Sequence, residues 1–74
     1  MILTVEPTRG TLKTLTITTP IDGVYRVNAG SRTLGYVLEC DSVFVALSGS
    51  VYNTSVEVAQ SHDLESAVRV LAAR

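Results

Sequence analysis

LGYVLECDSVFVALS, residues 34–48, carries the clearest strand pattern in the chain. It predicts two antiparallel strands joined at Cys40–Ser42, because every second residue is apolar and side chains alternate across a strand. We expect one face of this hairpin to form the core. The residues of that face are Leu34, Tyr36, Leu38, Cys40, Val43, Val45 and Leu47. The residues expected on the opposite face are Gly35, Val37, Glu39, Phe44, Ala46 and Ser48.

Two further strands are predicted upstream, at residues 1–6 and 11–19. A three-residue loop, Thr8-Arg9-Gly10, with a left-handed glycine would place Leu3 opposite Leu15. Leu15 and Ile17 would then face the core. The threonines between them, Thr14, Thr16 and Thr18, would form an outward row, which is typical of a solvated strand surface. A ligand-binding threonine ladder is the alternative interpretation.

The loops on either side of residues 24–28 decide which faces coincide. The loop Ile21-Asp22-Gly23 has an odd length, which would place Tyr25 and Val27 on the side of Leu15. The turn at residues 28–31 has an even length, which would keep Tyr25 and Leu34 on one face. Each of these lengths preserves a single apolar face, so the pattern predicts a continuous antiparallel meander.

Gly49-Ser50 predicts a tight type II′ hairpin, because glycine comes first in a two-residue loop. Such a hairpin would pair the residues of strand 43–48 with those of a sixth strand. The expected pairs are Leu47 with Tyr52, Val45 with Thr54 and Val43 with Val56.

The periodicity changes in residues 63–73, DLESAVRVLAA. Here the apolar residues recur at the spacing of one helical stripe. They are Leu64, Ala67, Val68, Leu71 and Ala72. Asp63 is the predicted N-cap, with Ser61 as the alternative, and Glu65 suits the first-turn dipole. A helix this short is unstable alone, so we expect it to dock on the sheet.

These patterns predict one small α+β domain over residues 1–74. Its fold is an antiparallel β-meander of about six strands, strongly curled or a half-barrel, with one C-terminal α-helix packed on one face. We expect Leu38, Val45 and Leu71 to be buried where the helix crosses the central hairpin. Six strands span roughly 25–30 Å, whereas a helix is about 10 Å wide. Either the sheet curls or a second molecule covers the remainder.

Four apolar side chains on the predicted outward face have no element left to cover them. They are Val24, Val37, Phe44 and Ala46. Exposed apolar patches are commonly interfaces, so we predict that these residues bind a protein, most simply in a homodimer anchored by Phe44. Tyr36 and Tyr52 are alternative anchors if the other face is used. Scattered exposure of four modest side chains is the other interpretation.

Composition excludes several classes of protein. Six basic and seven acidic residues give a net charge of −1, so no polyanionic partner is indicated. A single cysteine, Cys40, excludes an internal disulfide and a cysteine-rich zinc site. No run approaches the roughly 20 apolar residues of a membrane span. The start of the chain lacks the features of a signal peptide, so we expect a cytoplasmic protein without a membrane partner.

No catalytic, cofactor-binding or metal-binding residue is predicted, and we expect that the chain is not an enzyme. Ser61-His62-Asp63 contains the residue types of a hydrolytic triad, but adjacent residues cannot converge on one reacting atom. Glu39 and Asp41 are carboxylates at a hairpin tip, and the sequence provides no cleft around them.

Three segments resemble small uncharacterised proteins of actinobacteria and their phages. They are Leu34–Val37, Val43–Leu47 and Leu64–Val68. The resemblance implies a small accessory protein of bacterial or phage origin, and it carries no site residue. The predicted function is a non-enzymatic protein–protein interaction module, such as a phage-encoded modulator of a host protein.

The alternative function is nucleic-acid binding through the sheet face. A small sheet with a C-terminal helix is also the plan of the arm-binding domains of phage integrases. A groove binder commonly neutralises about 6–10 phosphates, and this whole chain has six basic residues. The charge therefore makes this the weaker prediction.

Overall fold

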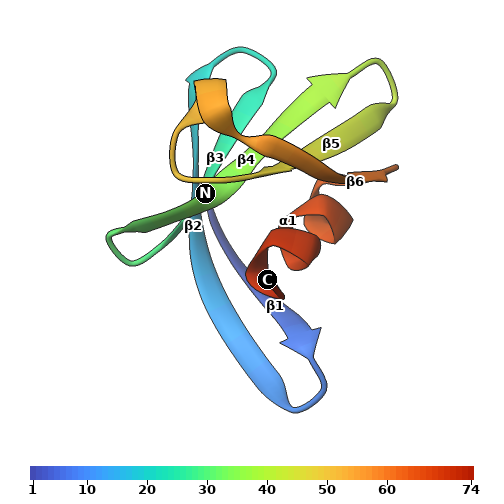
Figure 1. The fold of residues 1–74 in the computed structure, drawn as a ribbon. Helices are drawn as coiled ribbons and strands as arrows, with labels where there is room; N and C mark the ends of the chain where they lie inside the picture. The colour runs from blue at the N-terminus through green and yellow to red at the C-terminus, as the bar shows by residue number, and fades with distance from the viewer.

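The computed structural model describes residues 1–74 and shows six antiparallel strands followed by one α-helix (Figure 1). The strands lie in the sheet in sequence order, so the fold is an uninterrupted meander. The elements are β1 (Ile2–Thr8), β2 (Thr11–Ile21), β3 (Val24–Ala29), β4 (Arg32–Cys40), β5 (Val43–Ser48), the 3₁₀ turn η1 (Tyr52–Thr54), β6 (Val56–Ser61) and α1 (Leu64–Ala72). The predicted fold class is confirmed.

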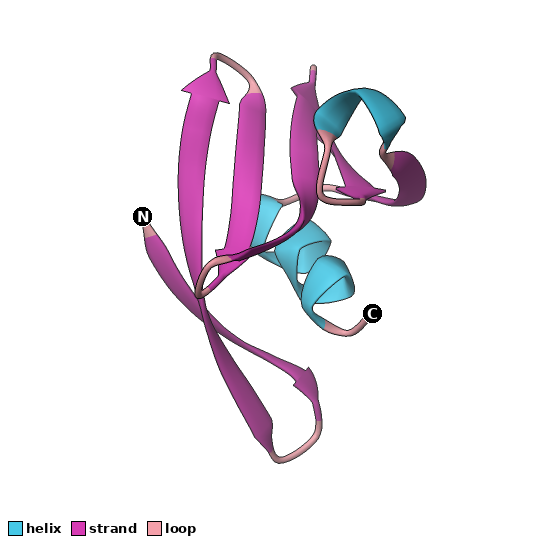
Figure 2. Ribbon diagram, turned by 60° about the vertical axis from the view of Figure 1, so that its left-hand side comes forward, coloured by secondary structure: helices cyan, strands magenta, loops and turns pink.

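The sheet curls around α1. The helix contacts the central strands β4 and β5 and also the two edge strands, β1 and β6. A flat six-stranded sheet could not bring both edges to one helix, because its strands are spaced about 4.8 Å apart. Figure 2 shows this curvature, with the helix lying against one side of the half-barrel. Curling is therefore how one helix suffices for the inner face.

The first two hairpins have the predicted strand pairing, although their turns are shorter than predicted. Their turns have two residues, not three, and each is preceded by a bulge in the incoming strand. In the first hairpin, Glu6 and Pro7 together lie opposite Leu12, at a position where proline has no N–H to donate to the ladder. The two turn residues and the one bulged residue make three, so side chains beyond the bulge have the same partners as with a three-residue loop. Leu3 therefore lies opposite Leu15, as predicted.

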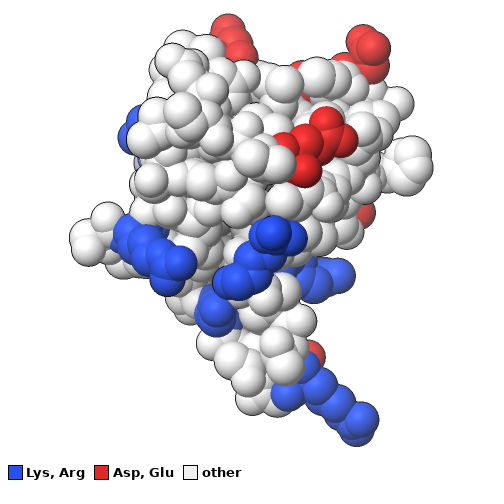
Figure 3. Space-filling model, viewed as in Figure 1, with Lys and Arg blue, Asp and Glu red and all other residues white.

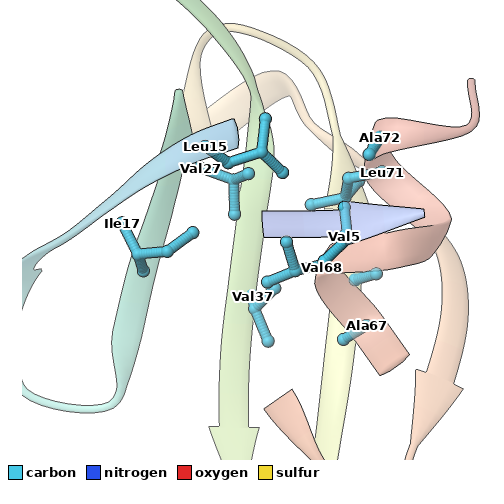
Figure 4. Close-up of a cluster of buried hydrophobic side chains, with 10 residues drawn as sticks. Val5, Leu15, Ile17, Val27, Val37, Ala67, Val68, Leu71 and Ala72 are labelled. Carbon is cyan, nitrogen blue, oxygen red and sulfur yellow. The ribbon is translucent and has the colours of Figure 1, made fainter. Parts of the chain in front are cut away.

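The core lies between the inner face of the sheet and α1 (Figure 4). Five strands contribute one or two residues each, and the helix contributes four. The cluster contains Val5, Leu15, Ile17, Val27, Val37, Ala46, Ala67, Val68, Leu71 and Ala72. The predicted helical stripe is confirmed, since four of its five members are buried and Leu64 packs against them.

The central hairpin is inverted relative to the prediction, because β4 contains a bulge. Asn28 pairs with Thr33, but Val27 pairs with Gly35, so Leu34 is an extra residue with no partner. A one-residue shift moves every later side chain to the other face. Val37 and Ala46 therefore face the helix, and the predicted core residues Leu38 and Val45 face away from it.

Close packing explains why Gly35 and its neighbours occupy the inner face. A Cβ on Gly35 would overlap the carbonyl oxygen of Leu47 and lie 3.0 Å from Cδ2 of Leu71. Backbone and helix can approach so closely only where the strand carries no side chain. Of the three residues predicted to be buried under the helix, Leu71 is confirmed, whereas Leu38 and Val45 are half-buried on the opposite face.

The predicted Gly49-Ser50 hairpin is wrong. Residues 49–55 form a longer loop containing η1, and β6 starts at Val56, which pairs with Ser48. The loop is held by its own hydrogen bonds, since the carbonyl of Val51 accepts from the hydroxyls of Thr54 and Ser55. The Tyr36 hydroxyl also donates to the carbonyl of Ser50 at 3.1 Å. These contacts stabilise the wide loop in place of the tight turn.

The start of α1 agrees with the prediction. Asp63 is extended, and its carboxylate accepts a 2.7 Å hydrogen bond from the backbone N–H of Ser66. At the other end, the Lys13 ammonium donates to the carbonyl oxygen of Ala72 at 2.8 Å. Each helix terminus thus gains one side-chain hydrogen bond, and the second contact ties the helix to β2. The structure contains no helix with the length and apolarity that a membrane crossing needs.

Candidate functional site

The four residues predicted as an interface do not share an exposed surface. Val37 and Ala46 are completely buried beneath α1, and Phe44 packs against the same cluster. Val24 is buried on the other face of the sheet, where it lies opposite Leu38. The expectation of an exposed patch at these positions was wrong. Val24 faces outward as predicted but is buried, and the β4 bulge turns Val37, Phe44 and Ala46 inward.

The face of the sheet opposite α1, here called the outer face, carries the larger apolar side chains. Residues directly opposite one another on neighbouring strands share a face. One row of such residues crosses five strands. It consists of Ile21, Val24, Leu38, Val45 and Gln60. Ile21 is 62% exposed, so this apolar row remains accessible at its β2 end.

A second row runs beside the first and is built around Tyr36. It consists of Thr18, Arg26, Tyr36, Leu47 and Glu57. The Arg26 guanidinium lies over the Tyr36 ring, with its carbon 5.8 Å from the ring centroid, which is within cation–π range. Tyr36 is nevertheless only 5% exposed, because residues of the 49–55 loop also cover it.

Tyr52 from η1 supplies the exposed aromatic surface of this region. Its ring packs edge-on against Tyr36, with centroids 5.4 Å apart, and 38% of the residue is exposed. The neighbouring Val51 is 56% exposed. Together with the two rows, these residues form an outer-face patch. Its apolar members are Ile21, Val24, Tyr36, Leu38, Val45, Leu47, Val51 and Tyr52.

Sequence reasoning identified most of these residues as apolar but placed them in the core. Tyr36 and Tyr52 were named only as alternative anchors. The signal that could have separated the two faces is residue size: the face with glycine and alanine suits close helix packing, whereas the face with tyrosine and leucine does not.

Tyr25 and Glu39 form a polar contact on the inner face. The Tyr25 hydroxyl donates to the Glu39 carboxylate at 3.1 Å. This hydrogen bond raises the pKa of Tyr25, and partial desolvation and the carboxylate charge act in the same direction. Glu39 is thus more than a solvated turn residue, whereas Asp41 lies in the tight turn with a positive φ of 54°.

Ser61, His62 and Asp63 are not arranged as a hydrolytic triad. The Asp63 carboxylate is directed to the helix N-terminus, and the hydrogen bond from Ser66 lowers its pKa. His62 and Ser61 line a shallow hollow together with Val43 and Gln60. No third group in that hollow orients the imidazole toward the serine, so the residues lack triad geometry.

Metal-binding residue types are scattered over the molecule. No group of three His, Cys, Asp or Glu side chains lies close enough together to hold a metal ion. Cys40 is exposed and lies opposite Val43 in the β4–β5 hairpin. The prediction of no cofactor remains a prediction from sequence.

Charged residues are divided between two ends of the molecule. In a meander, alternate turns lie at the same end, so Asp22 and Asp41 share one end and Arg9 and Arg32 share the other. In the view of Figure 3, Lys and Arg gather mainly over the lower half and Asp and Glu mainly over the upper half. The small net charge of −1 is therefore the sum of a mainly basic end and a mainly acidic end.

Comparisons with known proteins give no relative. No protein-family model matches the sequence, and no curated protein and no solved structure matches the chain significantly.

Proposed function

We propose that this chain is a small non-enzymatic protein–protein interaction module that binds through the outer-face patch. The observation that carries the proposal is the apolar row on the face without a helix, which runs from the exposed Ile21 past the buried Val24 to the half-buried Leu38 and Val45. Large contiguous apolar surfaces on small proteins are commonly interaction sites.

The composition of the patch supports this function. Interface hot spots are enriched in tyrosine and arginine, which offer rigid apolar area together with a polar group. Tyr52 and Arg26 both lie over Tyr36 and provide these residue types on one surface. Leu38, Val45 and Leu47 are half-buried beside them and would be desolvated by a partner.

The simplest partner is a second copy of the chain, in a twofold dimer. A standard interface buries about 800 Å² per partner. The two larger dimensions of the molecule are 32 and 26 Å, so a face that spans them is large enough. The resemblance to small actinobacterial and phage proteins suggests a context, a cytoplasmic modulator of a host protein, in which a host protein is a further partner.

Light scattering on the wild type and on surface variants tests the proposed function. We expect a dimeric mass at a concentration of about 100 µM and a monomeric mass for Tyr52→Arg or Ile21→Arg. Leu12→Arg is the matched control, because Leu12 is 70% exposed in β2 near the first hairpin turn, outside the patch. A monomeric wild type at that concentration would contradict the dimer. A dimeric Tyr52→Arg and Ile21→Arg double variant would exclude this face.

Nucleic-acid binding is a second candidate, and the gathering of Lys and Arg in Figure 3 favours it. The basic residues lie away from the outer face, apart from Arg26, so the contact would use the end with Arg9 and Arg32. Retention on heparin at physiological salt, lost in an Arg9→Glu and Arg32→Glu variant, would support it. Elution of the wild type in the void volume would exclude it.

A further inference from the structure

The outer row of β3–β6 has opposite charges at its two ends. Arg26 on β3, Tyr36 on β4, Leu47 on β5 and Glu57 on β6 are registered partners across the sheet. Arg26 and Glu57 are three strand spacings apart, which corresponds to about 14 Å. The order along the row is therefore positive, aromatic, aliphatic, negative.

Neither Arg26 nor Glu57 forms an ion pair within the chain. The one salt bridge of the structure joins Arg69 to Glu65 on the helix. Arg26 makes only the contact with the Tyr36 ring, and Glu57 is exposed and accepts a 2.8 Å hydrogen bond from the Gln60 amide. Both side chains remain available to a partner on the outer face.

Such a row is complementary to itself under a twofold rotation. In an isologous interface, residue i of one copy meets residue j of the other, and j meets i. Tyr36 is covered by the Tyr52 ring, so if the axis passes between Tyr36 and Leu47, Tyr52 faces Leu47 of the second copy. Arg26 then faces Glu57 of the second copy, and Glu57 faces its Arg26. A row with like charges at both ends would place equal charges together under this rotation.

We propose that the outer face binds a second copy in this single arrangement, with its row antiparallel to the first and two symmetric Arg26–Glu57 pairs at the rim. This arrangement rests on the proposed function, since it requires that the outer-face patch be the interface. The apolar centre supplies the contact area, and the charge pairs select the orientation, because like charges at an interface strongly disfavour other registers.

Reversing the charge of Arg26 or of Glu57 tests the arrangement, because mixing the two variants should restore the dimer that each one loses. Arg26→Glu alone places four carboxylates at the rim of the dimer, and Glu57→Arg alone places four guanidinium groups there. Each variant should weaken self-association roughly tenfold or more, as measured by sedimentation or light scattering. An equimolar mixture of the two variants should restore a dimer, because every contact then joins opposite charges. The double variant Arg26→Glu/Glu57→Arg should also dimerise.

Arg32→Glu is the control, because Arg32 is exposed in the β3–β4 hairpin opposite Ala29, whose side chain packs on the core. It changes the net charge as Arg26→Glu does but should leave the dimer intact. Circular dichroism checks that each variant is folded, and Glu57→Arg leaves the contact on Tyr36 in place. A folded Glu57→Arg that dimerises as the wild type does overturns the arrangement while leaving the proposed function standing. Failure of the mixture to associate more strongly than either variant also overturns it.

Discussion

The two faces of the central hairpin differ in side-chain size more than in polarity. The inner face of β4 and β5 presents Gly35, Val37 and Ala46 to the helix. The outer face presents Tyr36, Leu38, Val45 and Leu47. Both sets are apolar, although the inner face also carries Glu39, Phe44 and Ser48. The helix packs on the small residues of the inner face, and Leu38, Val45 and Leu47 of the outer face remain partly accessible.

This difference shows that hydrophobic alternation alone does not identify a core face. A helix that docks inside a curled sheet must approach the backbone closely, so small residues are favoured on both partners. On the helix they are Ala67 and Ala72, both buried. Large side chains on the outer face have no helix to accommodate and provide surface for a partner.

Gly35→Ala is expected to have the largest effect, because it tests the close approach directly. The added Cβ would overlap the Leu47 carbonyl oxygen, and a backbone atom cannot turn aside as a flexible side chain can. We expect a loss of about 3 kcal/mol in the free energy of unfolding, at the upper end of what overpacking usually costs. That loss is a large share of the stability of a domain of 74 residues, so the urea midpoint of the variant should be much lower than that of the wild type. Gly30→Ala is a control for replacing a glycine as such, because a Cβ there meets no atom within 4 Å and only the positive φ of 62° opposes the change. We expect it to cost about 1–2 kcal/mol, less than Gly35→Ala. Wild-type stability in Gly35→Ala would show that the strands are less tightly curled.

Leu71→Ala and Leu38→Ala compare how much the free energy of unfolding falls when a leucine is truncated on the inner face and on the outer face. Leu71 is 2% exposed in the centre of the inner core, so its truncation should reduce the free energy of unfolding by about 2–5 kcal/mol. Leu38→Ala on the outer face should reduce it by less, since Leu38 is half-buried and faces no helix. Chemical denaturation of both variants below the dimerisation concentration gives the comparison. Equal losses would contradict the assignment of Leu38 to the open face.

Asp63→Ala should destabilise the protein less than the core variants, by removing the cap of the helix that covers the inner face. The lowered pKa of Asp63 means that its contribution is present above the ordinary value of 3.8 and is lost as the pH falls through the folded value. Thermal melts between neutral and acidic pH should therefore converge for wild type and Asp63→Ala. Asp63→Asn keeps an acceptor for the Ser66 N–H and should lie between them at neutral pH. Ser61→Ala should melt as the wild type does, and a larger loss there would make Ser61 the cap.

The smallest effect concerns Tyr25 on the inner face. Its hydrogen bond to Glu39 raises its pKa above 10.0, so any stability from this contact is present below pH 10.0 and is lost as the pH rises through the folded value. Glu39→Gln should lower the pKa of Tyr25 toward 10.0, which titration of the Tyr25 ring resonances by NMR would follow. A Tyr25 pKa that does not respond would mean that the contact is absent in solution.

The register of the first hairpins could be predicted, whereas that of the central hairpin could not. Leu3 opposite Leu15 followed from parity, and the bulge at Glu6–Pro7 left that parity intact. The bulge at Leu34 changed it, and its one local sign is the neighbouring Gly35, which is compatible with a bulge but does not specify one. The error passed from Leu34 to every later residue of β4 and β5, and thereby to the predicted interface.

The wide loop at residues 49–55 shows a similar limit. Gly49-Ser50 is a strong local signal for a tight turn, but the Tyr36 hydroxyl bond to Ser50 and the Tyr36–Tyr52 packing favour the longer connection. Both contacts join residues 14 or more positions apart, so local turn preferences contain no information about them.

The sequence by itself determined six strands in meander order, the stripe of α1 and its cap at Asp63, because these depend on the period of apolar residues and on short-range hydrogen bonds. Only the tertiary structure decided which face of β4 and β5 lies under the helix. That choice depends on one bulged residue, Leu34, and on the space that Gly35 leaves between the Leu47 carbonyl and Leu71. A single-residue shift reverses a strand while leaving its apolar pattern unchanged, so the pattern cannot report it. The outer-face patch, with Arg26 and Glu57 at its ends, exists because of that reversal.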